Sequence, residues 1–227
     1  STAAVSDAGA TSVDITGLLD VSGTEITLGS GTFNAGSLTF TSGGLVTISE
    51  DTSLDLVGVN TADIADLDST AAVSDAGATS VDITGLIDVS GTEITLGSGT
   101  FNAGSLAFTS AGLVTISEGS SLDLVGVNTA GIADLDSTAA VSDAGAVSVD
   151  VTGLLDVSGT SIALGSGTSV FNAGALTFNS AGSVNIDESS SMLVSGSSTA
   201  GSGLGLVSTD DVTLDASVTV VGDTSIL

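Results

Sequence analysis

The chain has 227 residues and a formal net charge of −27 at pH 7, and it contains no Lys, Arg, His, Cys, Pro, Trp or Tyr. Because nucleic-acid binders neutralise phosphates with Lys and Arg, the composition excludes nucleic acid as a partner. It also excludes disulfides and the catalytic groups of Ser-His-Asp, lysine and cysteine enzymes. With 41% hydrophobic residues the chain has enough apolar side chains for a core, but no apolar run approaches the roughly 20 residues that membrane insertion requires.

The sequence repeats with a period of 68, since Ser1, Ser69 and Ser137 begin equivalent segments. The first two copies, residues 1–68 and 69–136, differ at six positions. The third copy, residues 137–206, is divergent and gains two residues within 165–171 before a Gly/Ser-rich passage. Residues 207–227 alternate again like a strand. Since each unit of a solenoid meets the same neighbours as the last, faithful duplication lengthens one, and we expect one continuous solenoid.

Within each copy, short runs alternate apolar and polar residues. In the first copy these runs are VDI (13–15), LTF (38–40), VTI (46–48) and LDL (54–56). Such alternation, bounded by Gly, Ser, Asn and Asp, predicts half-buried strands. There is little indication of helix, since only the segment TADIADLD (61–68) could form a single helical turn. We expect these side chains to point inward: Val13, Ile15, Leu38, Phe40, Val46, Ile48, Leu54 and Leu56. The six Phe residues are also expected in the core.

Three Asx residues begin similar stretches of small residues and predict corners. They are Asp7, Asn34 and Asn60, and the next equivalent is Asp75, so that the successive spacings are 27, 26 and 15. Asx and Gly tolerate the left-handed backbone that tight corners need. A mean of about 23 residues per turn suits a coil of three short strands, so about three coils make one repeat. The sequence therefore predicts an all-β fold, a parallel β-solenoid.

The acidic residues are interpreted as a solvated coat. Aligning the alternating runs places Asp14 beside Thr39 and Thr27 beside Asp55, so that an acid faces Thr rather than a like charge, which would destabilise a sheet. Three stacked coils place equivalent acids roughly 14 Å apart, which exceeds the Debye length of about 8 Å at physiological salt.

Few residues are candidates for a chemical site. Asp63, Asp66 and Asp68 supply carboxylates of the kind that calcium prefers, although the sequence has no DxDxDG loop. The alternative is an acidic corner without a bound ion. Paired carboxylates, as in glycosidases, are the remaining catalytic option, but most acids recur in two or three copies, whereas an active site is normally unique. We therefore expect no enzyme, no catalytic residue and no cofactor beyond weak or non-specific calcium.

The stretch FNAGSLTFTSGGLVTISEDTSLDLVG, residues 33–58, resembles the repeats of filamentous-haemagglutinin-like and autotransporter-passenger β-helices of bacterial surfaces. The resemblance covers residues 1–196 in style and the tail loosely. It implies a secreted β-helix used in adhesion or matrix building. The chain departs from that family in lacking every basic residue and in the near identity of its copies.

These observations favour a structural subunit of an extracellular or cell-surface filament, stalk or matrix. Because a solenoid end is an exposed sheet edge and no polar cap is evident, we expect head-to-tail self-assembly, with no nucleic-acid partner and no membrane insertion. The residues expected at the assembling ends are Ala3, Ala4, Val5, Val220, Ile226 and Leu227. The alternatives are an adhesin rod or other surface-binding solenoid, including an ice binder, and a carbohydrate-active β-helix enzyme.

Overall fold

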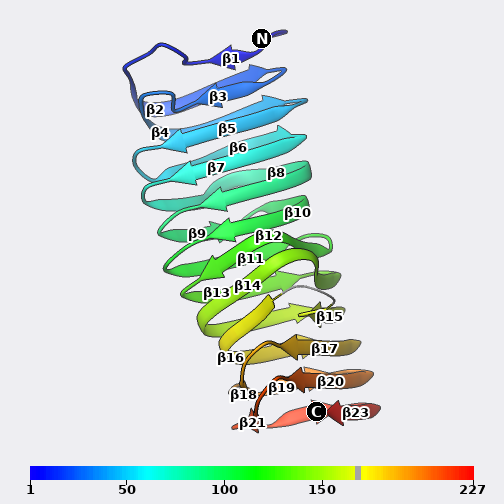
Figure 1. Cartoon of the computed structure of the whole chain (residues 1–227). Helices are drawn as coiled ribbons and strands as arrows, with labels where there is room; N and C mark the ends of the chain where they lie inside the picture. The colour runs from blue at the N-terminus through cyan, green and yellow to red at the C-terminus, as the bar shows by residue number, and fades with distance from the viewer. Residues whose placement is uncertain (167–169) are drawn as a thin grey trace. The chain divides into compact units, whose positions relative to one another are not determined.

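The computed structural model describes residues 1–166 and 170–227 (Figure 1). The described residues form 23 β-strands and no helix, as the alternating runs predict. The chain winds as a parallel β-solenoid of about 11 turns, with about 20 residues per turn. The two-residue insertion within 165–171 lies partly outside the described residues.

The chain divides into two compact units. The first unit contains residues 1–111 and 115–117, and the second contains residues 112–114 and 118–227. Strand β11 (Leu113–Glu118) supplies residues to both.

The remaining strands are short to medium in length. Those of the first unit are β1 (Val5–Ser6), β2 (Ser12–Gly23), β3 (Ile26–Leu28), β4 (Thr32–Ser42), β5 (Leu45–Glu50), β6 (Leu54–Ala62), β7 (Ile64–Ser69), β8 (Ala72–Ser90), β9 (Glu93–Leu96) and β10 (Thr100–Thr109). Those of the second unit are β12 (Leu122–Ala130), β13 (Ile132–Ser137), β14 (Ala140–Gly159), β15 (Ser161–Leu164), β16 (Val170–Ser180), β17 (Ser183–Glu188), β18 (Met192–Val194), β19 (Ser198–Ala200), β20 (Gly203–Ser208), β21 (Val212–Leu214), β22 (Val218–Val220) and β23 (Asp223–Ile226).

Each strand pairs in parallel with the strand one coil further along the chain. In the first unit β1, β3, β5 and β7 form one stack, and β2 pairs with β4. Longer strands continue around a corner, which shows as a register shift between Ile15 and Leu18 of β2. In the second unit β17, β20 and β23 stack in the same way. Successive coils therefore satisfy each other's backbone hydrogen bonds.

The sequence repeat is not a whole number of turns. One row of paired residues begins at Val5 and includes Ile87 four coils later. Leu19, which is the first-copy equivalent of Ile87, lies in another row, where it pairs with Leu38. At about 20 residues per turn, one copy of the repeat winds through more than three complete turns but fewer than four. Equivalent acids therefore lie on different sides of the coil, and the expectation that they recur roughly 14 Å apart after three stacked coils is wrong.

The core consists of the inward residues of the alternating runs. Six predicted inward side chains are at most 1% exposed: Leu38, Phe40, Val46, Ile48, Leu54 and Leu56. All six Phe residues are likewise buried. Val13 and Ile15 are only half-buried, because β2 has a stacked partner, β4, on one side only. Their second-copy equivalents, Val81 and Ile83, lie between two strands and are buried.

The register differs from the expected pairing of acids with Thr. Asp14 pairs with Asn34, and Thr27 pairs with Thr47. Residues 13–15 are therefore not neighbours of residues 38–40, and residues 26–28 are not neighbours of residues 54–56. Corner length and bulges set the register as much as apolar alternation does.

Candidate functional site

The three predicted calcium candidates lie on and just before β7. Asp66 is half-buried and Asp68 is exposed, and because they are two residues apart on one strand their side chains share a face. Asp63 precedes the strand, where its Oδ1 accepts a hydrogen bond of 2.9 Å from the hydroxyl of Thr84. The fold therefore brings Asp66 and Asp68 together, while Asp63 lies at a corner and is hydrogen-bonded to Thr84.

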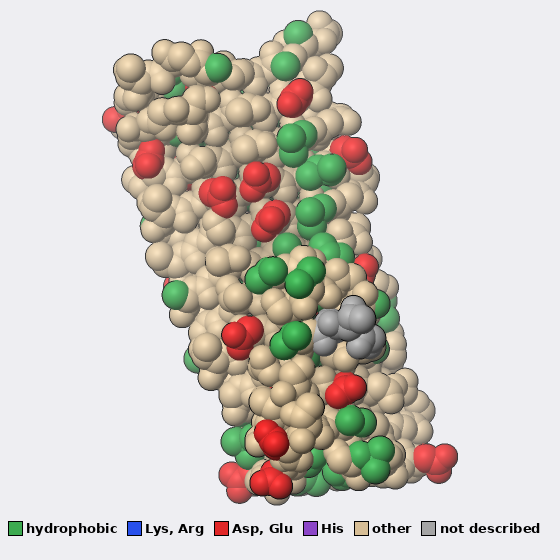
Figure 2. Space-filling model, in the orientation of Figure 1, with side chains coloured by type: hydrophobic (Ala, Val, Ile, Leu, Met, Phe, Trp, Pro, Cys, Tyr) green, Lys and Arg blue, Asp and Glu red, His purple; other side chains and the backbone are tan. Residues whose placement is uncertain are grey.

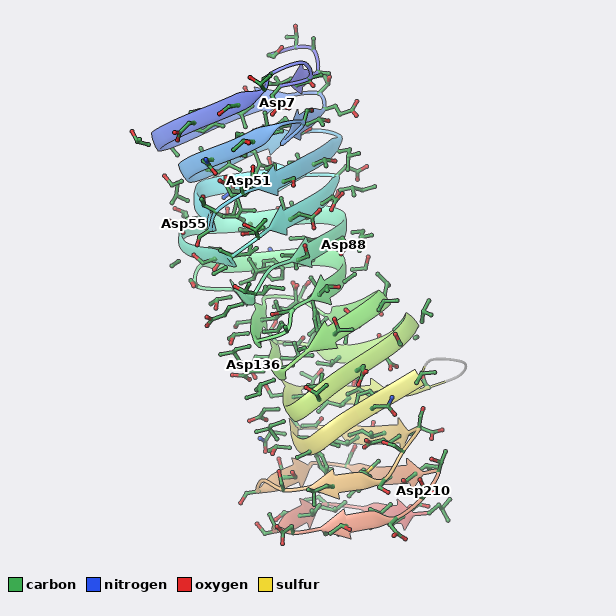
Figure 3. All side chains as sticks on the ribbon, turned by 60° about the vertical axis from the view of Figure 1, so that its left-hand side comes forward. Asp7, Asp51, Asp55, Asp88, Asp136 and Asp210 are labelled. Atoms are coloured by element: carbon green, nitrogen blue, oxygen red, sulfur yellow. The ribbon has the colours of Figure 1, made fainter. Side chains whose placement is uncertain are left out.

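An acid stacks directly on an acid at this position. Asp66 of β7 pairs in register with Asp88 of β8, and in the second unit Asp134 pairs with Asp156. The expectation that acids face Thr is wrong here, since both sets place like charges directly opposite each other. We call Asp66, Asp68 and Asp88 the first ledge, and Asp134, Asp136 and Asp156 the second ledge; Figure 3 labels one residue of each, Asp88 and Asp136.

Both ledges contain one carboxylate held by a serine. The hydroxyl of Ser90 donates to Oδ1 of Asp68, and the hydroxyl of Ser158 donates to Oδ1 of Asp136 in the same way. The stacked pairs themselves have no such hydroxyl donor among the hydrogen bonds of the described residues. Their charges are therefore compensated mainly by solvent.

Burial and neighbouring charges raise the pKa of the four stacked carboxyls, Asp66, Asp88, Asp134 and Asp156. Burial raises the pKa of Asp66, and the charges of Asp68 and Asp88 raise it further. Burial and then the charge of Asp68 raise the pKa of Asp88. The second ledge behaves alike, because burial and the charge of Asp136 raise the pKa of Asp134 and of Asp156. These four stacked carboxyls therefore take up protons at higher pH than an isolated Asp.

A hollow of about 320 Å³ lies beside Asp63. It is lined by Ser42, Gly43, Thr61, Ala62, Asp63, Asp82 and Thr84. Two of these positions are among the six that differ between the first two copies, since the second copy has Ala111 and Gly131 there. Within residues 1–166 and 170–227 no group of three or more acidic side chains is placed to hold a metal ion.

A class of inward carboxylates binds backbone amides. The carboxylate of Asp7 accepts hydrogen bonds from the amides of Gly29 and Ser30, at 2.8 and 3.2 Å. Asp75, which is fully buried, binds the equivalent amides of the next copy at 2.7 and 3.0 Å. Gly29 has a φ of +105°, a conformation that favours glycine. Burial alone would raise the pKa of Asp7, but these amides outweigh it and lower the pKa.

A second class of inward carboxyls is formed by Glu. Glu50, Glu118 and Glu188 are at most 1% exposed, and they end strands β5, β11 and β17. Sequence reasoning missed both classes of buried acid. The signal for the Glu class was present, because in VTISE the Glu continues the inward alternation of Val46 and Ile48.

Asn60 and Asn128 make structural hydrogen bonds near the corners. Asn60 is fully buried; its Oδ1 accepts from the amide of Phe40 at 3.0 Å and its Nδ2 donates to the carbonyl of Val57 at 3.0 Å. Asn128 is also fully buried and makes the same donation in the second unit. These side chains satisfy backbone groups that the corners leave unpaired.

The residues predicted at the assembling ends are half-buried or exposed. Ala3 and Ala4 are exposed and Val5 is half-buried. At the other end Val220 is half-buried, and the remaining two predicted residues, Ile226 and Leu227, are 43% and 75% exposed.

On the corresponding outer face of the third copy, a glycine and a valine occupy the positions of the two β7 acids, Asp66 and Asp68. Beside β17, β20 occupies the place that β7 has beside β5, and Gly205 stands where β7 has Asp66. Two shallow hollows of about 190 and 290 Å³ lie over β17 and β20, and both are lined by Asn185 and Gly205. Figure 2 shows acidic side chains scattered among neutral surface and apolar patches on one face.

Comparison with known proteins gives no match to a protein-family model, a curated protein or a solved structure. The β-helix fold agrees with what the sequence resemblance implies, whereas the bacterial surface-protein type has no matching relative in its support. None of the described residues belongs to a helix with the length and hydropathy needed to cross a membrane. The functional argument therefore rests on the fold and its side chains.

Proposed function

We propose that the chain is a structural subunit of an extracellular filament, stalk or matrix, and that it assembles head to tail through its solenoid ends. The observation that carries the proposal is the contrast between equivalent residues in inner and terminal coils. Val81 and Ile83 are at most 1% exposed, whereas their equivalents in β2, Val13 and Ile15, are half-buried.

The C-terminal end of the second unit shows the same contrast. Leu206 of β20 is fully buried, while Ile226, its partner in β23, is 43% exposed. Val194 of β18 is fully buried, while its partner Leu214 in β21 is 44% exposed. Both ends therefore present an unpaired parallel edge together with apolar side chains.

A second copy of the chain is the occupant that fits both ends. A coil added to either end would continue parallel pairing and cover the exposed apolar residues. Because the two ends differ, such a contact is heterologous and continues as a filament rather than closing into a dimer. The composition supports an extracellular place, since a chain without Lys and Arg has no trypsin cleavage site.

Sedimentation velocity of the purified chain tests this proposal. We expect the wild-type chain to form large species at micromolar concentration, and Ile226→Asp to reduce them, because a charge replaces an end-face apolar side chain. The matched control is Val147→Asp, since Val147 is 66% exposed on β14, away from the ends. A stable wild-type monomer, or equal effects of the two variants, would refute head-to-tail assembly through these ends.

An adhesin or other surface-binding solenoid is the second proposal, and the hollows over β17 and β20 favour it. Ice binding receives less support from the rows of outward-facing residues that pair in register from coil to coil. The row Thr27–Thr47 continues into Asp66, and the row Thr41–Thr61 continues into Asp82. Neither row is the regular Thr array that a flat ice-binding face requires.

A further inference from the structure

Three glutamates occupy inward positions of the core, and the stacking of the coils does not require an acidic side chain there. Each sequence copy has one, at Glu50, Glu118 and Glu188, and each lies two residues after a buried Ile on the inward side of its strand. Their retention in the divergent third copy, after a two-residue insertion, shows that the position is a regular feature of the coil.

The contacts of Glu188 compensate a negative charge poorly. Its Oε1 accepts from the amide of Ala173 at 3.0 Å and from the hydroxyl of Ser190 at 3.2 Å. Its Oε2 is buried and has no hydrogen-bond partner in the described structure. An ionised carboxylate with an unpartnered buried oxygen carries a large desolvation cost.

Glu50 is bound in a similar way. Both of its carboxyl oxygens share the single amide of Ala35, at 3.1 and 3.2 Å, and Oε1 also accepts from the hydroxyl of Thr52 at 2.9 Å. The amide-binding Asp75 differs, because its two oxygens each receive their own backbone amide. The core therefore holds two kinds of carboxyl, one with enough donors for an anion and one without.

No positive charge faces either glutamate. The strands packed against Glu50 bring Ala35 from β4 and Ser69 from β7, and the one charged group that acts on it is the adjacent Asp51, which repels an anion. The strands packed against Glu188 bring Ala173 from β16 and Ser208 from β20.

Uncharged neighbours thus surround Glu188, and the preceding residue, Asp187, is exposed. The sequence contains no Lys, Arg or His that could pair with either glutamate.

We propose that Glu50 and Glu188 are carried as neutral carboxylic acids in the folded solenoid, so that folding is coupled to proton uptake. Burial, the largest cause in both cases, raises the pKa of Glu50 and of Glu188 above the ordinary value of 4.5. The stability that protonated Glu50 and Glu188 contribute is fully present below the pKa that these groups have in the unfolded chain. It is lost as the pH rises through the raised folded-state pKa. At Glu50 and Glu188, acid therefore stabilises the folded chain and alkaline conditions destabilise it.

Carbon-13 labelling of the Glu carboxyls tests the proposal on the unmodified chain. The chain has five Glu, and two of them, Glu25 and Glu93, are exposed and serve as internal references. Magic-angle-spinning NMR from pH 3 to pH 8 reads every carboxyl whether or not the chain forms filaments. Glu50→Gln and Glu188→Gln assign the two signals of interest.

We expect the signals of Glu50 and Glu188 to stay at the protonated shift at pH values where Glu25 and Glu93 are ionised. Thermal unfolding gives the second readout. Glu188→Gln, which mimics the neutral acid, raises the midpoint at pH 7.5 and leaves it unchanged at pH 3. The control Asp187→Asn makes the same acid-to-amide change at the exposed neighbouring residue and has a smaller effect at pH 7.5.

Signals of Glu50 and Glu188 that titrate together with the exposed pair, or below them, would overturn the proposal. So would a Glu188→Gln chain that is less stable than wild type at pH 7.5, since that result identifies a site built for the anion.

Discussion

Replacing Asp88 by Asn removes one of two charges that face each other across β7 and β8. Asp66 and Asp88 pair in register. Favourable cross-strand pairs contribute roughly 0.2–1 kcal/mol, and we take the destabilisation by like charges directly opposite each other to be of the same order. Both carboxyls are partly solvated, so the lower half of that range applies. We therefore expect Asp88→Asn to raise the free energy of unfolding at pH 7 by about 0.5 kcal/mol.

The sign of the pH dependence follows from the direction of the shifts. Burial, and then the charge of Asp68, raise the pKa of Asp88 in the folded chain, so the ionised ledge opposes folding. The cost disappears as the pH falls through the raised pKa. The gain from Asp88→Asn is therefore present at pH 7 and absent at pH 3.

A double-mutant cycle isolates the pair. Denaturant unfolding of Asp66→Asn, Asp88→Asn and the double variant should give an unfavourable coupling of roughly 0.2–1 kcal/mol at pH 7. The matched control is Asp82→Asn on the same strand, because the in-register partners of Asp82 are Thr61 and Asn102 rather than an acid. A coupling of zero, or equal gains from Asp88→Asn and Asp82→Asn, would refute the reasoning.

Three further predictions concern the core, the amide-binding acids and the charged coat. Phe101→Ala should lower the free energy of unfolding by about 3–5 kcal/mol, because Phe101 is 1% exposed and its loss leaves a cavity; a loss under about 1 kcal/mol in denaturant would contradict this packing. Asp7→Asn should destabilise at pH 7 but not at pH 2, since the lowered pKa of Asp7 gives stability that is lost on acidification; equal calorimetric midpoints at pH 7 would count against it. Acidification to about pH 4 should cause lateral bundling as the carboxylates protonate, and flat light scattering from pH 7 to pH 3 would argue against a repulsive coat.

The fold and most of the core could be predicted because they depend on local pattern. Alternating runs with a period of two specify which side chains face inward, and Phe40, Ile48 and Leu56 are buried as the pattern requires. Val13 and Ile15 are exceptions for a non-local reason, since their burial depends on how many coils stack on β2.

The register and the polar interior could not be predicted in the same way. The alternating pattern does not say how many residues each corner uses, and the register shift between Gly58 and Val59 changes which residues oppose each other. Asp66 and Asp88 therefore pair in register, although the alternating pattern of the sequence does not predict this pairing. The inward Glu50 was overlooked because a charged residue is usually assigned to the solvent side.

Electron cryo-microscopy of the purified chain at neutral pH tests the central claim most directly. Head-to-tail assembly predicts unbranched filaments whose images diffract at about 4.8 Å along the filament axis, because coils then stack in the direction of growth. Isolated particles of single-chain mass, or fibres with the same roughly 4.8 Å spacing across the axis, would contradict it.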